Sequence, residues 1–231
     1  LATKAGHFLP RGEGEDWTYE LVASSIDRSL ELMKTDHIDL VQLHSCTVEI
    51  LERGDVVRAL QDARAAGKTR FIGYSGDNEN AKWAVTSRLF DTLQTSFNLV
   101  DQSARTNLFA DVEAGGMGLI IKRPIANAVW GAPADPQPYS HIPDYAAEYF
   151  RRAGVMAAEG PLADDPGDRI RLALGFTFAH TEVDVTIVGT QRPDHMQSNL
   201  DMVSKPLGVS ESTVADLHAR WDRFSDGWEQ R

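Results

Sequence analysis

Short apolar runs alternate along this chain with longer segments whose apolar residues recur every three or four positions. The most distinct run spans residues 38–44, where mainly apolar side chains end in His44. Runs of four to eight apolar residues between helical segments are typical of buried parallel strands. We therefore predict a strand at 38–44, with His44 at its carboxyl end. In parallel α/β proteins the chemistry lies at that edge of the sheet.

The same pattern predicts six strands in all. They lie near residues 1–4, 38–44, 70–75, 92–96, 118–122 and 184–188. Helical periodicity fills the intervals, at about 19–33, 52–66, 79–88, 103–114, 143–153, 169–179 and 193–203, with a last helix after Ser210. Strands that alternate with helices form parallel sheets with right-handed crossovers. A Pro-, Gly- and aromatic-containing segment at 123–167 interrupts the pattern, and we expect a functional lid there.

Composition and charge narrow the class of protein. The 231 residues are 42% hydrophobic and 25% charged, as in an ordinary globular protein. A net charge of −11, without a cluster of Lys and Arg, argues against nucleic acid and anionic membranes as partners. We expect no signal peptide, and no apolar run approaches the roughly 20 residues that span a bilayer. The single cysteine, Cys46, cannot form an internal disulfide, so we expect a cytoplasmic protein.

Polar residues stand at the carboxyl end of every predicted strand. They are Lys4, His44, Ser75, Gln94, Lys122 with Arg123, and Gly189 through Arg192. Because the carboxyl ends of parallel strands meet at one rim, we expect these side chains to lie together. Taken singly, His44 is more simply a hydrogen-bonded core residue and Lys4 a surface residue. A whole polar rim beneath a long aromatic segment instead favours a binding site.

Several motifs resemble the aldo-keto reductase family, in order, from Leu1 to about Val203. They are Ala2–Lys4, Ser29–Leu30 with Met33, Asp36–Leu40 followed by Leu43–His44, Ile72–Ser75, Leu93–Gln94 with Asn98, and Ile187–Pro193 with Asn199. The segment that ends at His44 is the most specific of them. The resemblance implies a TIM (β/α)8 barrel that transfers hydride from a nicotinamide cofactor, usually NADPH, to an aldehyde or ketone.

The resemblance also implies roles for individual residues. Lys4 and His44 match two of the family's four catalytic residues, which are Asp, Tyr, Lys and His. The histidine orients or polarises the carbonyl through a hydrogen bond, and the lysine makes the tyrosine a better proton donor. Ser75 and Gln94 are expected to hold the nicotinamide carboxamide, and Arg123 to stack on the ring. The adenosine phosphate end is expected to contact Gly189, Thr190, Gln191, Arg192, His195 and Asn199, with Arg192 or His195 available to a 2′-phosphate.

Three positions depart from the family pattern. Gly76 replaces an Asn that usually follows the serine, which removes one expected contact to the carboxamide. Arg123 stands where an aromatic residue often stacks on nicotinamide, although a guanidinium plane can stack as well. Ser198 replaces the acid that pairs with adenine.

The largest departure is at the front of the chain. In the family the lysine ends the third strand, so our six strands are strands three to eight and two βα units are absent before Leu1. Tyr74 cannot supply the missing phenol, because alternation turns it to the face opposite Ser75. We therefore expect residues 1–231 to be one N-terminally incomplete barrel domain. It should be nearly inactive alone and self-associate through its open edges.

Two other functions remain open at this point. The scaffold can serve as a non-catalytic, cofactor-binding regulatory or interaction subunit. A different barrel enzyme, such as an aldolase with Lys4 as a Schiff base, needs an acid–base pair near the lysine, and nothing in the sequence specifies one.

Overall fold

The computed structural model describes residues 1–7, 15–132 and 144–231, and contains six strands at the predicted positions. They are β1 (Ala2–Ala5), β2 (Ile38–His44), β3 (Thr69–Ser75), β4 (Thr92–Ser96), β5 (Gly118–Lys122) and β6 (Val185–Ile187). Each begins and ends within one residue of its predicted bounds. The predicted lid at 123–167 lies partly outside the described residues, at 133–143.

The strands form a sheet in the order β1-β2-β3-β4-β5-β6, the same as their order in the sequence. The pairs β1–β2, β2–β3 and β3–β4 are parallel. Sequential parallel strands separated by helices are the arrangement of a TIM-like α/β fold, as predicted. The prediction that two further βα units precede the chain stays a prediction.

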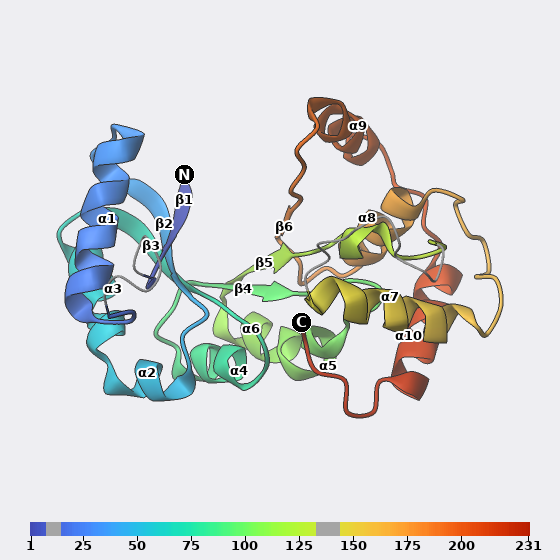
Figure 1. The fold of residues 1–231 in the computed structure, drawn as a ribbon, viewed down its shortest axis with the longest axis horizontal. Coiled ribbons are helices and arrows are strands. Elements are labelled where there is room, and N and C mark those ends of the chain that lie inside the picture. Colours follow the sequence, from blue (N-terminus) through green and yellow to red (C-terminus); the bar gives the residue numbers. More distant parts are fainter. Residues whose placement is uncertain (8–14, 133–143) are drawn as a thin grey trace. The chain divides into compact units, whose positions relative to one another are not determined.

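The helices fill the intervals between the strands (Figure 1). They are α1 (Tyr19–Met33), α2 (Val48–Arg53), α3 (Asp55–Ala65), α4 (Asn78–Ser87), α5 (Ser103–Asn107), α6 (Phe109–Gly115), the 3-10 turn η1 (Ala126–Ala128), α7 (Asp144–Ala157), α8 (Arg169–Phe178), α9 (Pro193–Val203) and α10 (Glu211–Phe224). Three helices begin at residues suited to a helix N-terminus. Thr18 Oγ1 accepts from Leu21 N at 3.2 Å, Ser210 Oγ accepts from Thr213 N at 3.1 Å, and Pro193 occupies the first turn of α9.

Two single-helix predictions were wrong. The segment predicted at 52–66 is two helices, α2 and α3, separated by Gly54 at φ 79°. A left-handed residue cannot continue a right-handed helix, and glycine adopts that conformation without steric cost. The segment predicted at 103–114 is likewise divided into α5 and α6, at Leu108, whose φ is −127°.

The chain forms two compact units. Unit 1 comprises Leu1–Thr95 and Asn107–Ile120, and unit 2 comprises Ser96–Thr106 and Ile121–Arg231. In unit 1, α1 and α3 pack on each other and lie alongside β1–β3 (Figure 1). The buried residues of these helices recur at helical spacing, as in Val22 and Ile26 of α1. The prediction of a single domain over 1–231 stays a prediction.

Unit 2 has a fully buried arginine in its core. The guanidinium of Arg152 lies 3.6 Å from Asp101 and donates to the carbonyl oxygen of Glu229 at 2.6 Å. The rings of Trp221 and Trp228 flank it, with centroids 5.7 and 5.1 Å away. A buried charge is tolerated only when it is paired and hydrogen-bonded, so this network is part of the core of unit 2.

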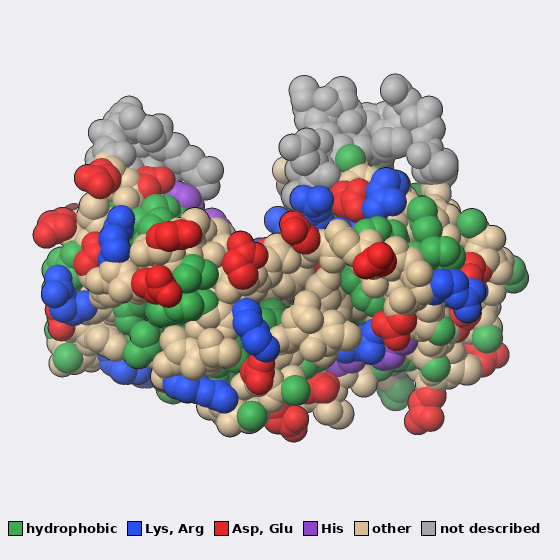
Figure 2. Space-filling model, turned by 90° about the horizontal axis from the view of Figure 1, so that it is seen from below, with side chains coloured by type: hydrophobic (Ala, Val, Ile, Leu, Met, Phe, Trp, Pro, Cys, Tyr) green, Lys and Arg blue, Asp and Glu red, His purple; other side chains and the backbone are tan. Residues whose placement is uncertain are grey.

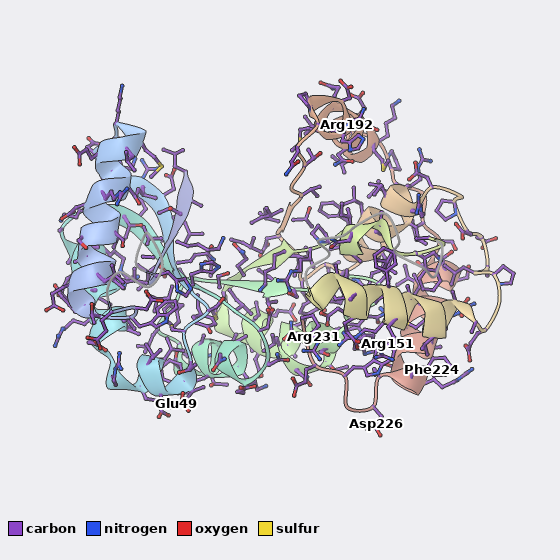
Figure 3. All side chains as sticks on the ribbon, viewed as in Figure 1. Glu49, Arg151, Arg192, Phe224, Asp226 and Arg231 are labelled. Carbon is purple, nitrogen blue, oxygen red and sulfur yellow. The ribbon has the colours of Figure 1, made fainter. Side chains whose placement is uncertain are left out.

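The tail after α10 returns to the end of β4. Figure 3 labels Phe224, the last residue of α10, and Asp226 and Arg231 of the tail. Ser96 Oγ donates to the carbonyl oxygen of Arg231 at 2.6 Å, and the amide of Gln230 donates to the carbonyl oxygen of Ser96 at 2.8 Å. The tail is therefore held at the carboxyl end of a strand of the sheet.

Charged side chains of both signs lie on the surface. Acidic and basic side chains are mixed over the face shown in Figure 2. In the part of the chain that the structure describes, no helix has both the length and the apolar character to cross a bilayer.

Candidate active site

Three of the predicted site residues lie in one row across the sheet of unit 1. His44 at the end of β2 is the register partner of Ser75 on β3, and Ser75 is the partner of Gln94 on β4. Register partners in adjacent parallel strands project their side chains to the same face. Ser75 and Gln94 are buried, and His44 is half-buried. The strands thus bring together the three residues that the sequence predicted at their ends.

Lys4 belongs to the neighbouring row on the same face. It pairs with Gln42, which pairs with Gly73, and Gly73 pairs with Thr92. Gln42 and Gly73 each stand two residues before the members of the first row on their own strands, so both rows share one face. Lys4 itself is exposed, on the first strand of the sheet.

Gln42 was not among the residues predicted from the sequence. Its side chain is 2% exposed, and its Nε2 has no hydrogen-bond partner among the residues that the structure describes. A buried amide donor without a partner is costly, and such groups cluster at functional sites. The signal was available, because Gln42 precedes His44 by two residues on the same strand and therefore faces the same side.

Tyr74 lies on the opposite face, as predicted. Its side chain is fully buried, and its hydroxyl donates to the carbonyl oxygen of Cys46 at 2.7 Å. Burial raises the pKa of this phenol well above its usual value. A phenol with a raised pKa is a poorer proton donor, so Tyr74 does not supply the family's general acid.

The position of Tyr74 also explains Gly76. A Cβ atom at residue 76 would lie 2.5 Å from the hydroxyl oxygen of Tyr74 and 2.7 Å from its Cζ. The Asn that the family usually has there cannot fit unless Tyr74 moves. The replacement of Asn by Gly76 is therefore coupled to the tyrosine beneath it.

A second histidine, not predicted from the sequence, lies beside His44. The ring of His7, in the loop after β1, has its centroid 5.3 Å from that of His44, with an interplanar angle of 82°. His7 Nδ1 lies 2.9 Å from a carboxylate oxygen of Asp16. No sequence signal marked this pair, because residues 5–17 have no periodicity and the contact spans nine positions.

Trp17 fixes the base of this loop. Its backbone N–H donates to the carbonyl oxygen of Gly6 at 2.9 Å, and its carbonyl oxygen accepts from Arg53 at 2.8 Å. A Cβ atom on Gly6, which has φ 134°, would overlap the Trp17 ring. The indole lies 4.5 Å from the ring of His7, so His7 packs between two aromatic rings.

Unit 2 contains a cavity of about 730 Å³. Predicted cofactor residues contribute to its wall, namely Arg123, Gly189, Thr190, His195 and Asn199, together with Ser198 at the position of the family's acid. Phe150 and Met202 supply part of its apolar surface. Gln191 and Arg192 do not line it. Arg192 is the N-cap residue of α9, where Figure 3 labels it, and its side chain is exposed.

Arg123 follows directly after β5 in a left-handed conformation, with φ 60°. Its guanidinium donates to Ser96 Oγ at 3.3 Å, and its carbonyl oxygen accepts from Asn98 at 3.1 Å. Ser96 is also the residue that holds Arg231. Ser96 therefore connects the tail after α10 to Arg123, a predicted cofactor contact, because it hydrogen-bonds to both Arg231 and Arg123.

Known proteins are similar to this chain in sequence. The chain is 26% identical over 228 residues to L-galactose dehydrogenase from Arabidopsis thaliana. The alignment covers 95% of this chain and 69% of that protein. It is 31% identical over 107 residues to the uncharacterized oxidoreductase YqkF from Bacillus subtilis. That alignment covers 44% of this chain and 34% of the other protein.

Solved structures share the fold. Aldo-keto reductase AKR11C1 from Bacillus halodurans, in its holo form, superposes with a TM-score of 0.74 at 20% identity, over 95% of this chain and 72% of that one. A putative aldo-keto reductase from Pseudomonas aeruginosa gives a TM-score of 0.65 at 22% identity, over 90% and 66%. The profile of the aldo/keto reductase family matches residues 1–219, and this chain belongs to that family of oxidoreductases.

Proposed function

We propose that this chain carries the site of an NADPH-dependent reduction of an aldehyde or ketone to an alcohol. The observation that supports this most directly is the row His44–Ser75–Gln94, since two residues suited to a carboxamide stand beside a histidine suited to a carbonyl. When bound, a nicotinamide cofactor would supply the hydride. Family membership makes an oxidoreductase the expected activity, so the non-catalytic alternative is not favoured.

His44 and Lys4 have distinct roles in this proposal. Negative charge grows on the carbonyl oxygen as the carbon is reduced, and an N–H of His44 stabilises that charge by a hydrogen bond. The ammonium of Lys4 lowers the pKa of a neighbouring proton donor. In the family that donor is a tyrosine, and no residue of this chain matches it or its aspartate partner. We therefore propose that these 231 residues alone turn over aldehydes poorly.

The cavity of unit 2 fits part of a dinucleotide. At about 730 Å³ it is within the usual range for ligand pockets, and Arg123, Thr190 and Asn199 give it polar groups. The N-terminus of α9 offers N–H groups to an anion, and Arg192 and His195 lie within its first turn. We assign these two residues to a 2′-phosphate.

Fluorescence titration with NADPH and NADH tests the cofactor assignment without requiring turnover. We expect NADPH to bind at least about tenfold more tightly, since Arg–phosphate contacts are charge-assisted. Arg192→Ala should remove most of that preference and leave NADH binding unchanged. Arg171→Ala, which removes an exposed arginine of α8 in the same unit, is the matched control. Equal affinities in the unmodified chain would contradict the 2′-phosphate assignment.

Two further expectations stay proposals. Strands β1 and β6 are the ends of the sheet. Leu1, just before β1, is 66% exposed, and Val185 and Ile187 on β6 are 50% and 45% exposed. Such edges pair with other chains, so we propose self-association, which light scattering can measure. The cytoplasm as its location rests on Cys46, which is buried and unpaired with another cysteine.

A further inference from the structure

We propose that Ser96 is a positioning residue of the cofactor site, and that the tail after α10, residues 225–231, acts through it. In this assignment the Ser96 hydroxyl, oriented by the tail, keeps the guanidinium of Arg123 where it can stack on the nicotinamide ring. The inference rests on the proposed function, because it takes Arg123 as the residue at that ring. It adds a residue and a segment of the chain that set how tightly the nicotinamide end of the cofactor binds.

Arg123 needs a fixed position to stack on a ligand. Its long side chain loses conformational entropy when it is immobilised, so a partner that fixes it before the cofactor binds increases affinity. Arg123 lines the cavity of unit 2, and its guanidinium donates to Ser96 Oγ at 3.3 Å. Its backbone is held as well, since the carbonyl oxygen of Arg123 accepts from the amide of Asn98 at 3.1 Å.

The tail orients the Ser96 hydroxyl. A serine hydroxyl has one proton to donate and two lone pairs that accept. Ser96 Oγ donates that proton to the carbonyl oxygen of Arg231 at 2.6 Å, so its lone pairs are left to accept from Arg123. Loss of the Arg231 carbonyl would remove the acceptor that fixes this orientation.

Buried side chains hold the tail in turn. The amide of Gln230 donates to the carbonyl oxygen of Ser96 at 2.8 Å, and the backbone N–H of Arg231 donates to a carboxylate oxygen of Asp101 at 2.9 Å. Ser96, Asp101 and Gln230 are all buried, where hydrogen bonds are stronger than in water. These contacts fix residues 230 and 231 beside Ser96.

Tyr149 makes a further contact to the same carbonyl group. Its hydroxyl lies 3.1 Å from the carbonyl oxygen of Arg231 and 3.1 Å from a carboxylate oxygen of Asp101. The phenol is fully buried on α7. Because Ser96 and Tyr149 approach the same oxygen, the Arg231 carbonyl is a well-defined acceptor for the serine proton.

The test measures binding at the nicotinamide end separately from binding at the adenosine end. The probe 2′,5′-ADP has the adenosine and 2′-phosphate of NADPH and lacks the nicotinamide. In calorimetric titrations of Ser96→Ala we expect the Kd of NADPH to rise about fivefold or more, as for one lost stacking contact, with that of 2′,5′-ADP changed less than about twofold. Arg123→Ala should show the same split. The double variant should bind NADPH no more weakly than Arg123→Ala, because Ser96 acts through the arginine.

Ser103 provides a matched control on the same tail. Its hydroxyl donates to the carbonyl oxygen of Trp228 at 3.3 Å, and it is buried like Ser96. Ser103→Ala removes a serine bond to the tail without removing the Ser96 hydroxyl, and should change the binding of neither ligand. Ser96→Thr keeps a hydroxyl and should retain most of the affinity for NADPH. A chain that ends at Glu229 lacks both tail groups that bind Ser96, and should match Ser96→Ala.

Thermal unfolding of each variant identifies a general loss of structure, which would weaken both ligands equally. An equal loss for both ligands in Ser96→Ala, or unchanged NADPH binding, would overturn the assignment and leave the proposed function standing. Unchanged NADPH binding in the chain that ends at Glu229 would overturn it too, since the tail would then not act through Ser96. If the unmodified chain binds neither ligand, the proposed cofactor and this assignment are both wrong. If the split appears but a version with the family's tyrosine and aspartate reduces no aldehyde, the reaction is wrong and the positioning role stands.

Discussion

In unit 1 the predicted site residues lie on strands, whereas in unit 2 most of them lie on the loop and helix after β6. His44, Ser75 and Gln94 are placed by parallel register, and no side-chain interaction is needed to bring them into one row. The unit 2 residues from Gly189 to Asn199 have no such constraint, and α9 contains no buried residue. The core of unit 2 instead depends on buried side-chain networks, of which Arg152 is the centre of one.

This contrast separates two ways of building a site. Where backbone hydrogen bonds between strands fix the positions of side chains, substitution of one residue removes the chemical group of that residue and leaves the fold largely unchanged. Where a buried ionic network fixes a core, one substitution leaves other charges unpaired and affects the whole unit. The four predictions below test that difference, in order of decreasing effect.

The largest effect should come from Arg152→Ala. Removal of the guanidinium leaves Asp101 buried without its cationic partner and the carbonyl of Glu229 without a donor, at a cost of about 3–5 kcal/mol in unfolding free energy. Chemical denaturation followed by tryptophan fluorescence measures this, because Trp221 and Trp228 flank the site. The neighbouring Arg151→Ala is the control, labelled in Figure 3 and half-exposed, and should cost less than about 1 kcal/mol. If both substitutions lowered the unfolding free energy by a similar amount, the buried network would not be what stabilises the core of unit 2.

His44→Ala should affect chemistry and leave the fold intact. In a version of the protein that also carries the family's catalytic tyrosine and aspartate, we expect kcat on aldehydes to fall about 10²-fold or more. Cofactor affinity should change little, since His44 contacts the carbonyl in our proposal. Steady-state kinetics and cofactor titration measure the two quantities separately. Unchanged activity would make His44 a structural residue of the sheet.

Gly76→Asn introduces the family's usual residue into unit 1 and should destabilise it by about 1–3 kcal/mol, because its Cβ would overlap the Tyr74 ring. Tyr74→Leu makes room, so the double variant should be less destabilised than the sum of the two single changes. A double-mutant cycle from urea unfolding measures the coupling. Strict additivity would show that Tyr74 is not the reason for the glycine.

The smallest effect is a pH dependence confined to unit 2. His180 Nε2 lies 3.0 Å from His218 Nε2, and burial lowers the pKa of both rings, that of His218 to about 4. Between about pH 6.5 and pH 4 the unfolded chain therefore binds more protons than the folded chain. The unfolding free energy that these rings contribute above about pH 6.5 is lost as the pH falls toward 4. Since His218 is partly exposed, we expect about 1 kcal/mol. Denaturation across this range should show the slope, and His218→Phe should flatten it while His37→Phe does not.

The sequence predicted the strands of this fold better than its helices, for a physical reason. A buried strand is a continuous apolar run, and residues 38–44 are visible as one. The break at Gly54 was missed because helical spacing continues across it, and only the backbone conformation interrupts the helix. Strand alternation also placed Tyr74 correctly on the face opposite Ser75, because successive residues of a strand point to opposite faces of the sheet.

The positions of the candidate site residues could be predicted where strand ends determine them, but not where loops do. His44, Ser75 and Gln94 could be aligned from the sequence because each terminates a strand. His7 and Asp16 meet through a loop whose ends are joined by Gly6 and Trp17, and no local pattern predicts that closure. The relation between Gly76 and Tyr74 was equally hidden, because it depends on the volume of one ring.

The joined ends of that loop have a consequence for how this enzyme can change. Because Gly6 and Trp17 are hydrogen-bonded at 2.9 Å, the chain between them starts and finishes at one fixed point beside β1. The entropic cost of closing a loop rises only by about 0.6 kcal/mol for each doubling of its length. Insertions or deletions between these residues can therefore be accommodated at small entropic cost, while Lys4 and His44 stay where the strands put them.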